Sequence, residues 1–169
     1  MAATSDPIAY LGGRYIPISD ATLHVFDMGI VHGASVTEVL RTFRHRVFRL
    51  EEHLDRLIRS DQAVGFECEQ TRNDFEAIVT RLVSENARLI PPQHDLGVTV
   101  FVTAGLNPSY AGAGADRGAT ICVHTFPLPF ELWADKYREG QHLVTPEVRQ
   151  VPPNTLDPRI KSRSRLHWY

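Results

Sequence analysis

Residues 35–64 read SVTEVLRTFRHRVFRLEEHLDRLIRSDQAV, and the fold class follows from the patterns within them. The first nine residues, 35–43, alternate in polarity and are rich in Val and Thr, which predicts a β-strand. After a three-residue polar turn, Val47-Phe48-Arg49 is expected to return as a second strand. Apolar residues then recur at helical spacing over 50–64, and Gly65 is a typical helix stop. The stretch therefore predicts a strand hairpin that leads into an amphipathic helix.

Further strands and one more helix are expected on either side of this stretch. Thr71 followed by Asp74 resembles a capping box that opens a second helix to about residue 89. The Asn107–Gly118 stretch holds three glycines and a proline, so we expect a loop without regular structure. The remaining expected elements are a hairpin over 8–18 around Gly12-Gly13 and strands at 97–104, 119–126 and 143–148. This order predicts an α+β, two-layer domain with a mostly antiparallel sheet and two helices.

The domain organisation is expected to change near residue 127. Residues 1–127 contain the elements of one complete α+β domain. Residues 128–169 offer short strand-like pieces but no helix long enough to cover them. We therefore expect 128–169 to be a linker and the truncated start of a second domain.

Composition narrows the function classes. The chain has 169 residues, 22% of them charged, and a net charge of -2, which argues against a general binder of nucleic acid or membrane surfaces. It has no apolar run near the roughly 18 residues of a membrane helix and no secretory signal at its start, so a cytoplasmic protein is expected. Cys68 and Cys122 are expected to be reduced, buried thiols.

The sequence lacks the motifs of several common catalytic and ligand-binding sites. None of the eight histidines has the spacing of a helical zinc site, so no metal site is expected. Glycine-rich phosphate loops follow a strand and open a helix, whereas the nearest candidate, 111–115, precedes a strand. No serine stands in a nucleophile-elbow pattern.

Two basic residues could carry chemistry. The chain has only two lysines, Lys136 and Lys161, so a neutral amine nucleophile would come from one of them or from the N-terminus. Lys161 lies among three arginines, which is typical of a solvated basic surface. Neighbouring cations and burial would also favour a neutral amine that attacks a carbonyl. Arg56 lies roughly opposite the apolar stripe of its helix, either solvated or facing outward to bind an anion.

The order and spacing of several short motifs resemble the N-terminal part of the fold-type IV pyridoxal-phosphate enzymes, the class IV aminotransferases. That group includes branched-chain and D-amino-acid aminotransferases, R-selective amine transaminases and aminodeoxychorismate lyase. The resemblance runs from about Tyr10 to Tyr169. Its pieces are the Gly12-Gly13 hairpin, Phe26-Asp27-Met28-Gly29 leading into 33–38, Val47-Phe48-Arg49-Leu50, His53-Leu54-Asp55-Arg56-Leu57 and Arg159-Ile160-Lys161-Ser162.

The resemblance implies roles for individual residues. Lys161 would form the Schiff base with pyridoxal 5'-phosphate and shuttle protons, and Arg56 would bind the cofactor phosphate. Thr37 and Glu38 would lie on the strand that lines the substrate pocket. Ala104 stands where D-amino-acid aminotransferases carry an arginine for the substrate carboxylate. The implied reaction moves an amino group from an amino acid or amine to a 2-oxo acid, in a homodimer, without nucleic acid or membrane partners.

Two other functions stay open at this point. Thr37 is also the residue that aminodeoxychorismate lyase has there, whereas Glu38 is more typical of the transferases. A non-catalytic interaction domain could use the basic segment 159–165 to contact nucleic acid. The family's second domain supplies a glutamate for the pyridine nitrogen, so residues 1–169 alone are expected to have little transaminase activity.

Overall fold

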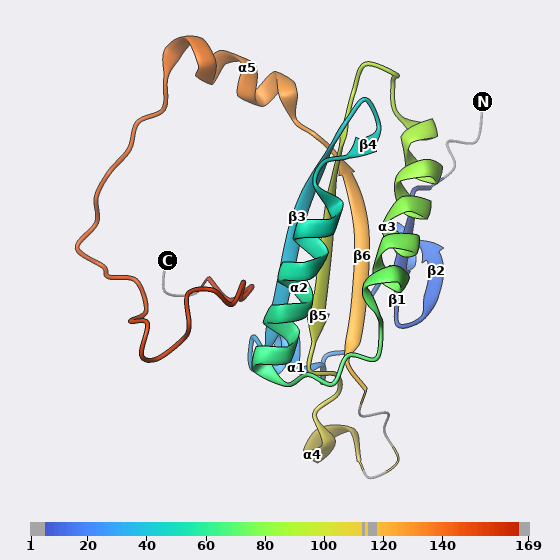
Figure 1. Ribbon diagram of the computed structural model, residues 1–169, viewed down its shortest axis with the longest axis vertical. Helices are drawn as coiled ribbons and strands as arrows, with labels where there is room; N and C mark the ends of the chain where they lie inside the picture. Colours follow the sequence, from blue (N-terminus) through green and yellow to red (C-terminus); the bar gives the residue numbers. More distant parts are fainter. Residues whose placement is uncertain (1–5, 113, 115–117, 166–169) are drawn as a thin grey trace.

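The computed structural model describes residues 6–112, 114 and 118–165, which are built around a six-stranded sheet (Figure 1). The strand order is β2-β1-β6-β5-β3-β4, and each of the five pairings between neighbouring strands is antiparallel. The predicted antiparallel α+β domain is thereby confirmed. The strands are β1 (Ile8–Leu11), β2 (Arg14–Pro17), β3 (Ser35–Phe43), β4 (Arg46–Val47), β5 (Leu96–Thr103) and β6 (Thr120–Pro127).

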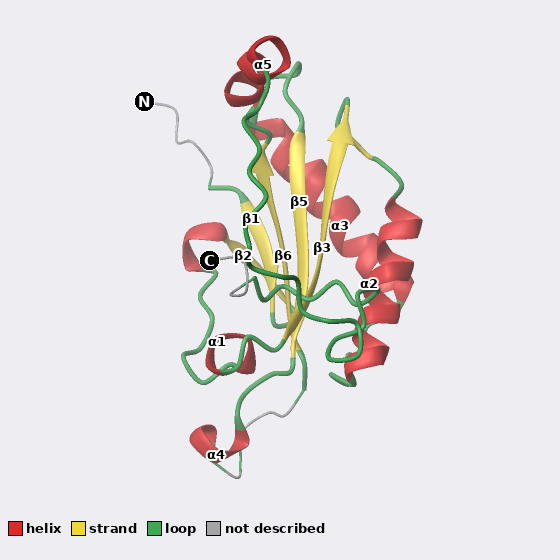
Figure 2. Cartoon of the chain, turned by 90° about the vertical axis from the view of Figure 1, so that its left-hand side faces the viewer, coloured by secondary structure: helices red, strands yellow, loops and turns green. Residues whose placement is uncertain are grey.

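Two long helices, α2 (Leu50–Val64) and α3 (Arg72–Asn86), pack on one face of the sheet (Figures 1 and 2). Alternate residues of β3 and β5 point into this layer, among them Val36, Leu40 and Val100, and join Leu54 and Phe75 in one buried cluster. The opposite face of the sheet is called the open face below. The shorter helical segments are η1 (Ile18–Asp20), α1 (Met28–Val31), η2 (Ala87–Leu89), α4 (Pro108–Ala111) and α5 (Phe130–Glu139).

The ends of the two long helices match their sequence signals. Gly65 ends α2 with a φ of 69°, a left-handed conformation that glycine adopts without steric cost. Thr71 and Asp74 form the predicted capping box, in which the Asp74 amide donates to the Thr71 hydroxyl and the Thr71 amide donates to the Asp74 carboxylate. Both helices were therefore predicted correctly.

The hairpin between β3 and β4 is shorter than expected. Arg44 and His45 both have positive φ and form a two-residue turn, which pairs Phe43 with Arg46. Strand pairing ends at Val47, so the prediction of a strand through Arg49 is wrong. Arg49 instead has a φ of 51° and is the N-cap of α2.

Three expectations beyond β5 are corrected. Residues 143–148 form no strand, because the segment lies away from every sheet edge and Leu143 and Val144 are more than 80% exposed. Residues 130–139 form α5, although no helix was expected there. Residues 108–111 form α4 inside the expected loop, with the Asn107 side chain accepting from the Ser109 amide. Positions 113 and 115–117 of that loop lie outside the described residues.

After α5 the chain runs through exposed residues without helix or strand and then returns to the sheet (Figure 1). Residues 160–163, called the return segment below, lie along the edge of β3 that β4 leaves uncovered. Ser162 forms an antiparallel bridge with Val36, and the Arg163 amide donates to the Ser35 carbonyl at 3.0 Å. Within the described ranges, every helix is too short or too polar to cross a lipid bilayer.

Candidate active site

Thr37 and Glu38 are neighbours on strand β3, and their side chains point to opposite faces of the sheet. Glu38 points into the helical layer, where its side chain is fully buried. Arg56 of α2 donates to both of its carboxylate oxygens, through Nε at 2.5 Å and Nη2 at 2.6 Å. His53, one helical turn earlier, lies with its Nδ1 2.8 Å from the Glu38 carboxylate. A buried carboxylate is thus held by one helix through two side chains.

The sequence pattern places Arg56 roughly opposite the apolar stripe of α2, whereas the structure pairs its Nε and Nη2 with the buried Glu38 carboxylate. Ser60 is buried as well as Leu54 and Leu57, so the buried face of α2 is broader than the leucine stripe, and Arg56 lies at its margin. The hydrogen bonds with Glu38 raise the pKa of Arg56 above its ordinary value. The guanidinium is planar and its Nε and Nη2 face Glu38, so the Nη1 amino group faces away from the carboxylate. The N–H groups of Nη1 can therefore bind an anion, while the hydrogen bonds to Glu38 fix the orientation of the guanidinium.

Lys161 is anchored to the same region through its backbone. Its amide donates to the hydroxyl of Ser60 at 3.2 Å, and its carbonyl accepts from the Thr37 amide at 3.0 Å. Ser60 is 2% exposed and follows Arg56 by four residues, which places both side chains on one side of α2. Sequence reasoning missed Ser60, and its i+4 spacing from Arg56 is the signal that could have identified it.

Arg56 and Lys161 line one cavity of about 260 Å³. Its remaining walls come from the return segment and from the chain on either side of it, including Leu156, Pro158 and Ser164. The structure therefore brings together two basic residues that are 105 positions apart in the sequence. A guanidinium and a primary amine in one cavity can bind a phosphate and attack a carbonyl.

The other predicted pocket residues are placed as follows. Thr37 lies on the open face of the sheet, and its hydroxyl donates to the Val100 carbonyl at 2.9 Å. Ala104 follows the last residue of β5, where its amide donates to the Ala34 carbonyl at 3.4 Å. Glu38 is buried behind Arg56, so its position supports a role in holding Arg56 rather than direct contact with a substrate.

Comparison with known proteins identifies the family. The model of the family described as "Amino-transferase class IV" matches residues 35–168, a range that contains Glu38, Arg56 and Lys161. The chain belongs to the class IV aminotransferases. It is similar to a putative branched-chain-amino-acid aminotransferase of Methanocaldococcus jannaschii, with 30% identity over 94% of this chain and 52% of that protein. A branched-chain-amino-acid aminotransferase-like protein of Arabidopsis thaliana is 32% identical over 95% of this chain and 28% of that protein.

Solved structures of branched-chain aminotransferases share the fold. A branched-chain amino acid aminotransferase complexed with N-(5'-phosphopyridoxyl)-L-glutamate superposes with a TM-score of 0.74 and 19% identity. The match covers 93% of this chain and 50% of that one. The chain thus spans about half the length, or less, of the relatives it matches.

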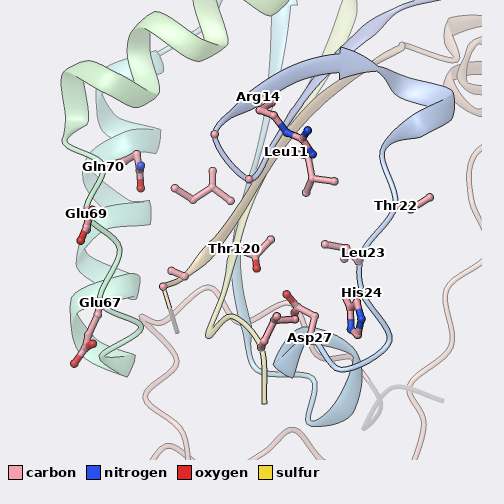
Figure 3. Close-up of a pocket in the computed structure, with 16 residues that line it drawn as sticks. Leu11, Arg14, Thr22, Leu23, His24, Asp27, Glu67, Glu69, Gln70 and Thr120 are labelled. Carbon is pink, nitrogen blue, oxygen red and sulfur yellow. The ribbon is translucent and has the colours of Figure 1, made fainter. Parts of the chain in front are cut away.

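A separate pocket of this class IV aminotransferase chain lies beside β1 and the start of β6 (Figure 3). It has a volume of about 620 Å³. Glu67, Glu69 and Gln70 form one side, and the segment with Leu23 and His24 forms the other. Asp27 lies at its base, where its carboxylate accepts from the Gly29 amide and the Thr103 hydroxyl. This pocket is distinct from the cavity that contains Arg56 and Lys161.

Proposed function

We propose that this chain is part of a pyridoxal-phosphate-dependent aminotransferase that moves an amino group between an amino acid or amine and a 2-oxo acid. One observation carries the proposal, namely that Arg56 and Lys161 line one cavity. Membership of the class IV aminotransferases and the pyridoxyl compound bound by a structural relative support it. When bound, the cofactor would supply a ring that accepts the electrons of the substrate α-carbon.

The residues of the cavity fit a phosphate ester that carries an aldehyde. Arg56 would hold the phosphate, since a guanidinium fork matches phosphate oxygens better than an ammonium does. Glu38 balances part of the Arg56 charge and fixes the plane of that fork. Lys161 would supply the amine that attacks the aldehyde, and its Nζ would later hold the proton that leaves the substrate α-carbon. The hydrogen bonds of the Lys161 backbone with Ser60 and Thr37 fix the position of the Cα atom that carries this side chain.

The same proposal covers the domain organisation and the oligomeric state of the whole protein. Residues 1–127 would form the N-terminal domain and 128–169 the start of a second one, and two copies of the whole protein would form a homodimer in the cytoplasm. Exposed apolar side chains on the open face of the sheet support such an assembly. Val39 and Phe43 are each about half exposed there.

Reductive labelling tests the proposal on the chain itself. The protein is incubated with pyridoxal phosphate and with phosphate-free pyridoxal, reduced with borohydride and mapped by peptide mass spectrometry. We expect the label on Lys161 in preference to Lys136, and a higher yield with the phosphorylated compound. Lys136 lies on the exposed helix α5 and serves as the internal reference.

Matched arginine variants of α2 separate phosphate binding from general charge. Arg56→Gln should remove the preference of Lys161 for pyridoxal phosphate over pyridoxal. Arg59→Gln, which changes an exposed arginine on the same helix, should leave that preference unchanged. Equal labelling of Lys136 and Lys161 in the unaltered chain would contradict the proposal.

A further inference from the structure

A small cavity lies beneath the connection between α2 and α3, at the lower end of the helical layer in Figure 1. It has a volume of about 210 Å³ and shares none of its lining residues with the cavity that contains Arg56 and Lys161. Apolar side chains from α2, α3 and β5 form much of its wall, namely Leu57, Ile58, Phe75 and Val102. All of these except Ile58 are at most 1% exposed, so the cavity reaches the buried core.

Two polar atoms in the lining of this cavity lack partners. Asp61 Oδ1 and Arg72 Nε are the only buried side-chain nitrogen or oxygen atoms without a hydrogen bond in the described parts of the chain, and both residues line this cavity. Other polar groups of the lining are paired. The Cys68 thiol donates to the Gln70 side-chain oxygen at 3.5 Å, and the Thr71 hydroxyl donates to the capping-box carboxylate at 2.6 Å. Because buried polar atoms are nearly always hydrogen-bonded, the two exceptions indicate a polar ligand.

The charges around the cavity indicate that this ligand is a cation. Arg72 is the only basic residue among the described residues of the lining, and two carboxylates already lie beside it. Its Nη2 is 3.0 Å from Glu51, and its Nε is 3.2 Å from Asp55 in a geometry that is not a hydrogen bond. Burial raises the pKa of Asp61, and a hydrogen bond with the Cys68 backbone offsets only part of that rise. A cationic ligand would supply the counter-charge that a buried carboxylate needs.

The two unpartnered atoms and the apolar walls define the functional groups of the ligand. Asp61 Oδ1 accepts, so the ligand needs a donor, and an ammonium group provides a charge-assisted one. Arg72 Nε carries one N–H and can only donate, so the ligand also needs an acceptor oxygen. The apolar side chains of the wall would contact an aliphatic body.

We propose that this cavity binds a small aliphatic amine that carries an acceptor oxygen, with its ammonium group at Asp61 and its oxygen at Arg72. The site does not depend on the proposed function, because the two cavities have no lining residue in common. Its ligand would nevertheless contact the helix that carries Arg56, because Asp61 lies on α2 as well.

Three related probes test the assignment. Leucinol has an ammonium group, a hydroxyl and a branched aliphatic body, whereas 4-methylpentan-1-ol lacks the amine and 4-methylpentan-2-amine lacks the hydroxyl. Each is titrated into the cofactor-free chain and followed by NMR chemical-shift changes. Leucinol should shift the signals of Phe75 and Val102. It should bind about tenfold more tightly than the alcohol and at least about twofold more tightly than the amine.

Asp61→Asn should remove the preference for leucinol over the alcohol. The change replaces an unpaired buried carboxylate with a neutral amide of similar shape, so the variant should unfold at no lower temperature than the unaltered chain. Leucinol should raise the Tm of the unaltered chain and not that of the variant. The matched control is Glu67→Gln, which removes an exposed carboxylate from the same connection, outside the cavity lining, and should leave the preference intact.

Equal binding of leucinol and 4-methylpentan-1-ol would overturn the assignment, as would a preference that survives Asp61→Asn. Shifts confined to residues that do not line this cavity would also overturn it. None of these outcomes bears on the proposed function, which the selective labelling of Lys161 tests separately.

Discussion

Glu38 is a carboxylate that the fold removes completely from water. Burying an isolated charge costs several kcal/mol, so such a group is retained only where partners compensate for its lost hydration. Arg56 and His53 are those partners, and both come from α2. The exposures of the charged pair differ, because the Arg56 side chain is 43% exposed and the Glu38 side chain is 0% exposed. The two partners should therefore respond differently to mutation.

Arg56→Met should destabilise the domain more than Glu38→Gln does. The first change leaves a buried carboxylate without its main counter-charge, which costs about 3–4 kcal/mol. The second leaves a half-exposed guanidinium that can turn toward water, and we expect a loss of about 1–2 kcal/mol. Urea unfolding of the two variants measures the difference.

The double variant checks the physical reason. Glu38→Gln combined with Arg56→Met should cost less than the sum of the single changes, because neither charge is then left unpaired. Arg59→Met, on the exposed side of α2, should change the free energy of unfolding by less than about 0.5 kcal/mol. A strictly additive double variant would show that the pair is not coupled.

At the scale of elements, Asp95 connects the β3–β4 hairpin to the start of β5. Its Oδ1 accepts from the Thr42 hydroxyl at 2.8 Å and from the His45 amide at 3.0 Å. The Thr42 hydroxyl in turn accepts from the Leu96 amide at 2.9 Å. Burial alone would raise the pKa of Asp95, but the hydrogen bonds outweigh it and hold the pKa below its ordinary value of 3.8.

Asp95→Asn should therefore lower stability in a pH-dependent way. A carboxylate whose pKa is lower in the folded state contributes stability above its unfolded pKa and loses that contribution as pH falls through the folded pKa. We expect a loss of about 1 kcal/mol at pH 7, limited by solvent screening at this partly exposed site, and a smaller difference from the unaltered chain as pH falls below 4. Thermal unfolding between pH 7 and pH 2 measures both. Glu147→Gln, in an exposed segment, should show no such trend.

Elements with strong local signals were predictable, and those without them were not. The bounds of α2 follow from its apolar spacing and Gly65, and the start of α3 follows from its capping box. Helix α5 buries none of its residues in the sheet domain, so no apolar stripe facing a core indicated it. Residues 143–148 have the composition of a strand, but a strand also needs a partner, and none of the sheet edges is near.

At the scale of the whole molecule, the candidate site depends on contacts between distant parts of the sequence. The family resemblance identified Lys161 and Arg56, but not the connection between them. The Lys161 amide donates to Ser60, which is 101 positions away, and the return segment pairs with the far edge of β3. Such pairing is decided by which edge the folded sheet leaves free, and this information is not local.

The return segment should therefore open as one unit, and Ser60 should control that opening. Three hydrogen bonds join the backbone of the return segment to β3 and α2, and they involve the amides of Thr37, Lys161 and Arg163. Ser60→Ala removes one acceptor and leaves the Lys161 amide unpaired, which costs about 1.4 kcal/mol, or a tenfold larger open fraction. Hydrogen exchange should become about tenfold faster at all three amides, while amides paired between β3 and β5 keep their rates.

Two further variants make this expectation specific. Ser60→Thr retains the hydroxyl and should keep exchange near the original rate. Ser84→Ala, at an exposed position of α3, should have no effect on the three amides. Faster exchange at Lys161 alone would show that the segment frays residue by residue. In that case the position of the Lys161 amine would be set by its own hydrogen bond to α2 and not by the pairing with β3.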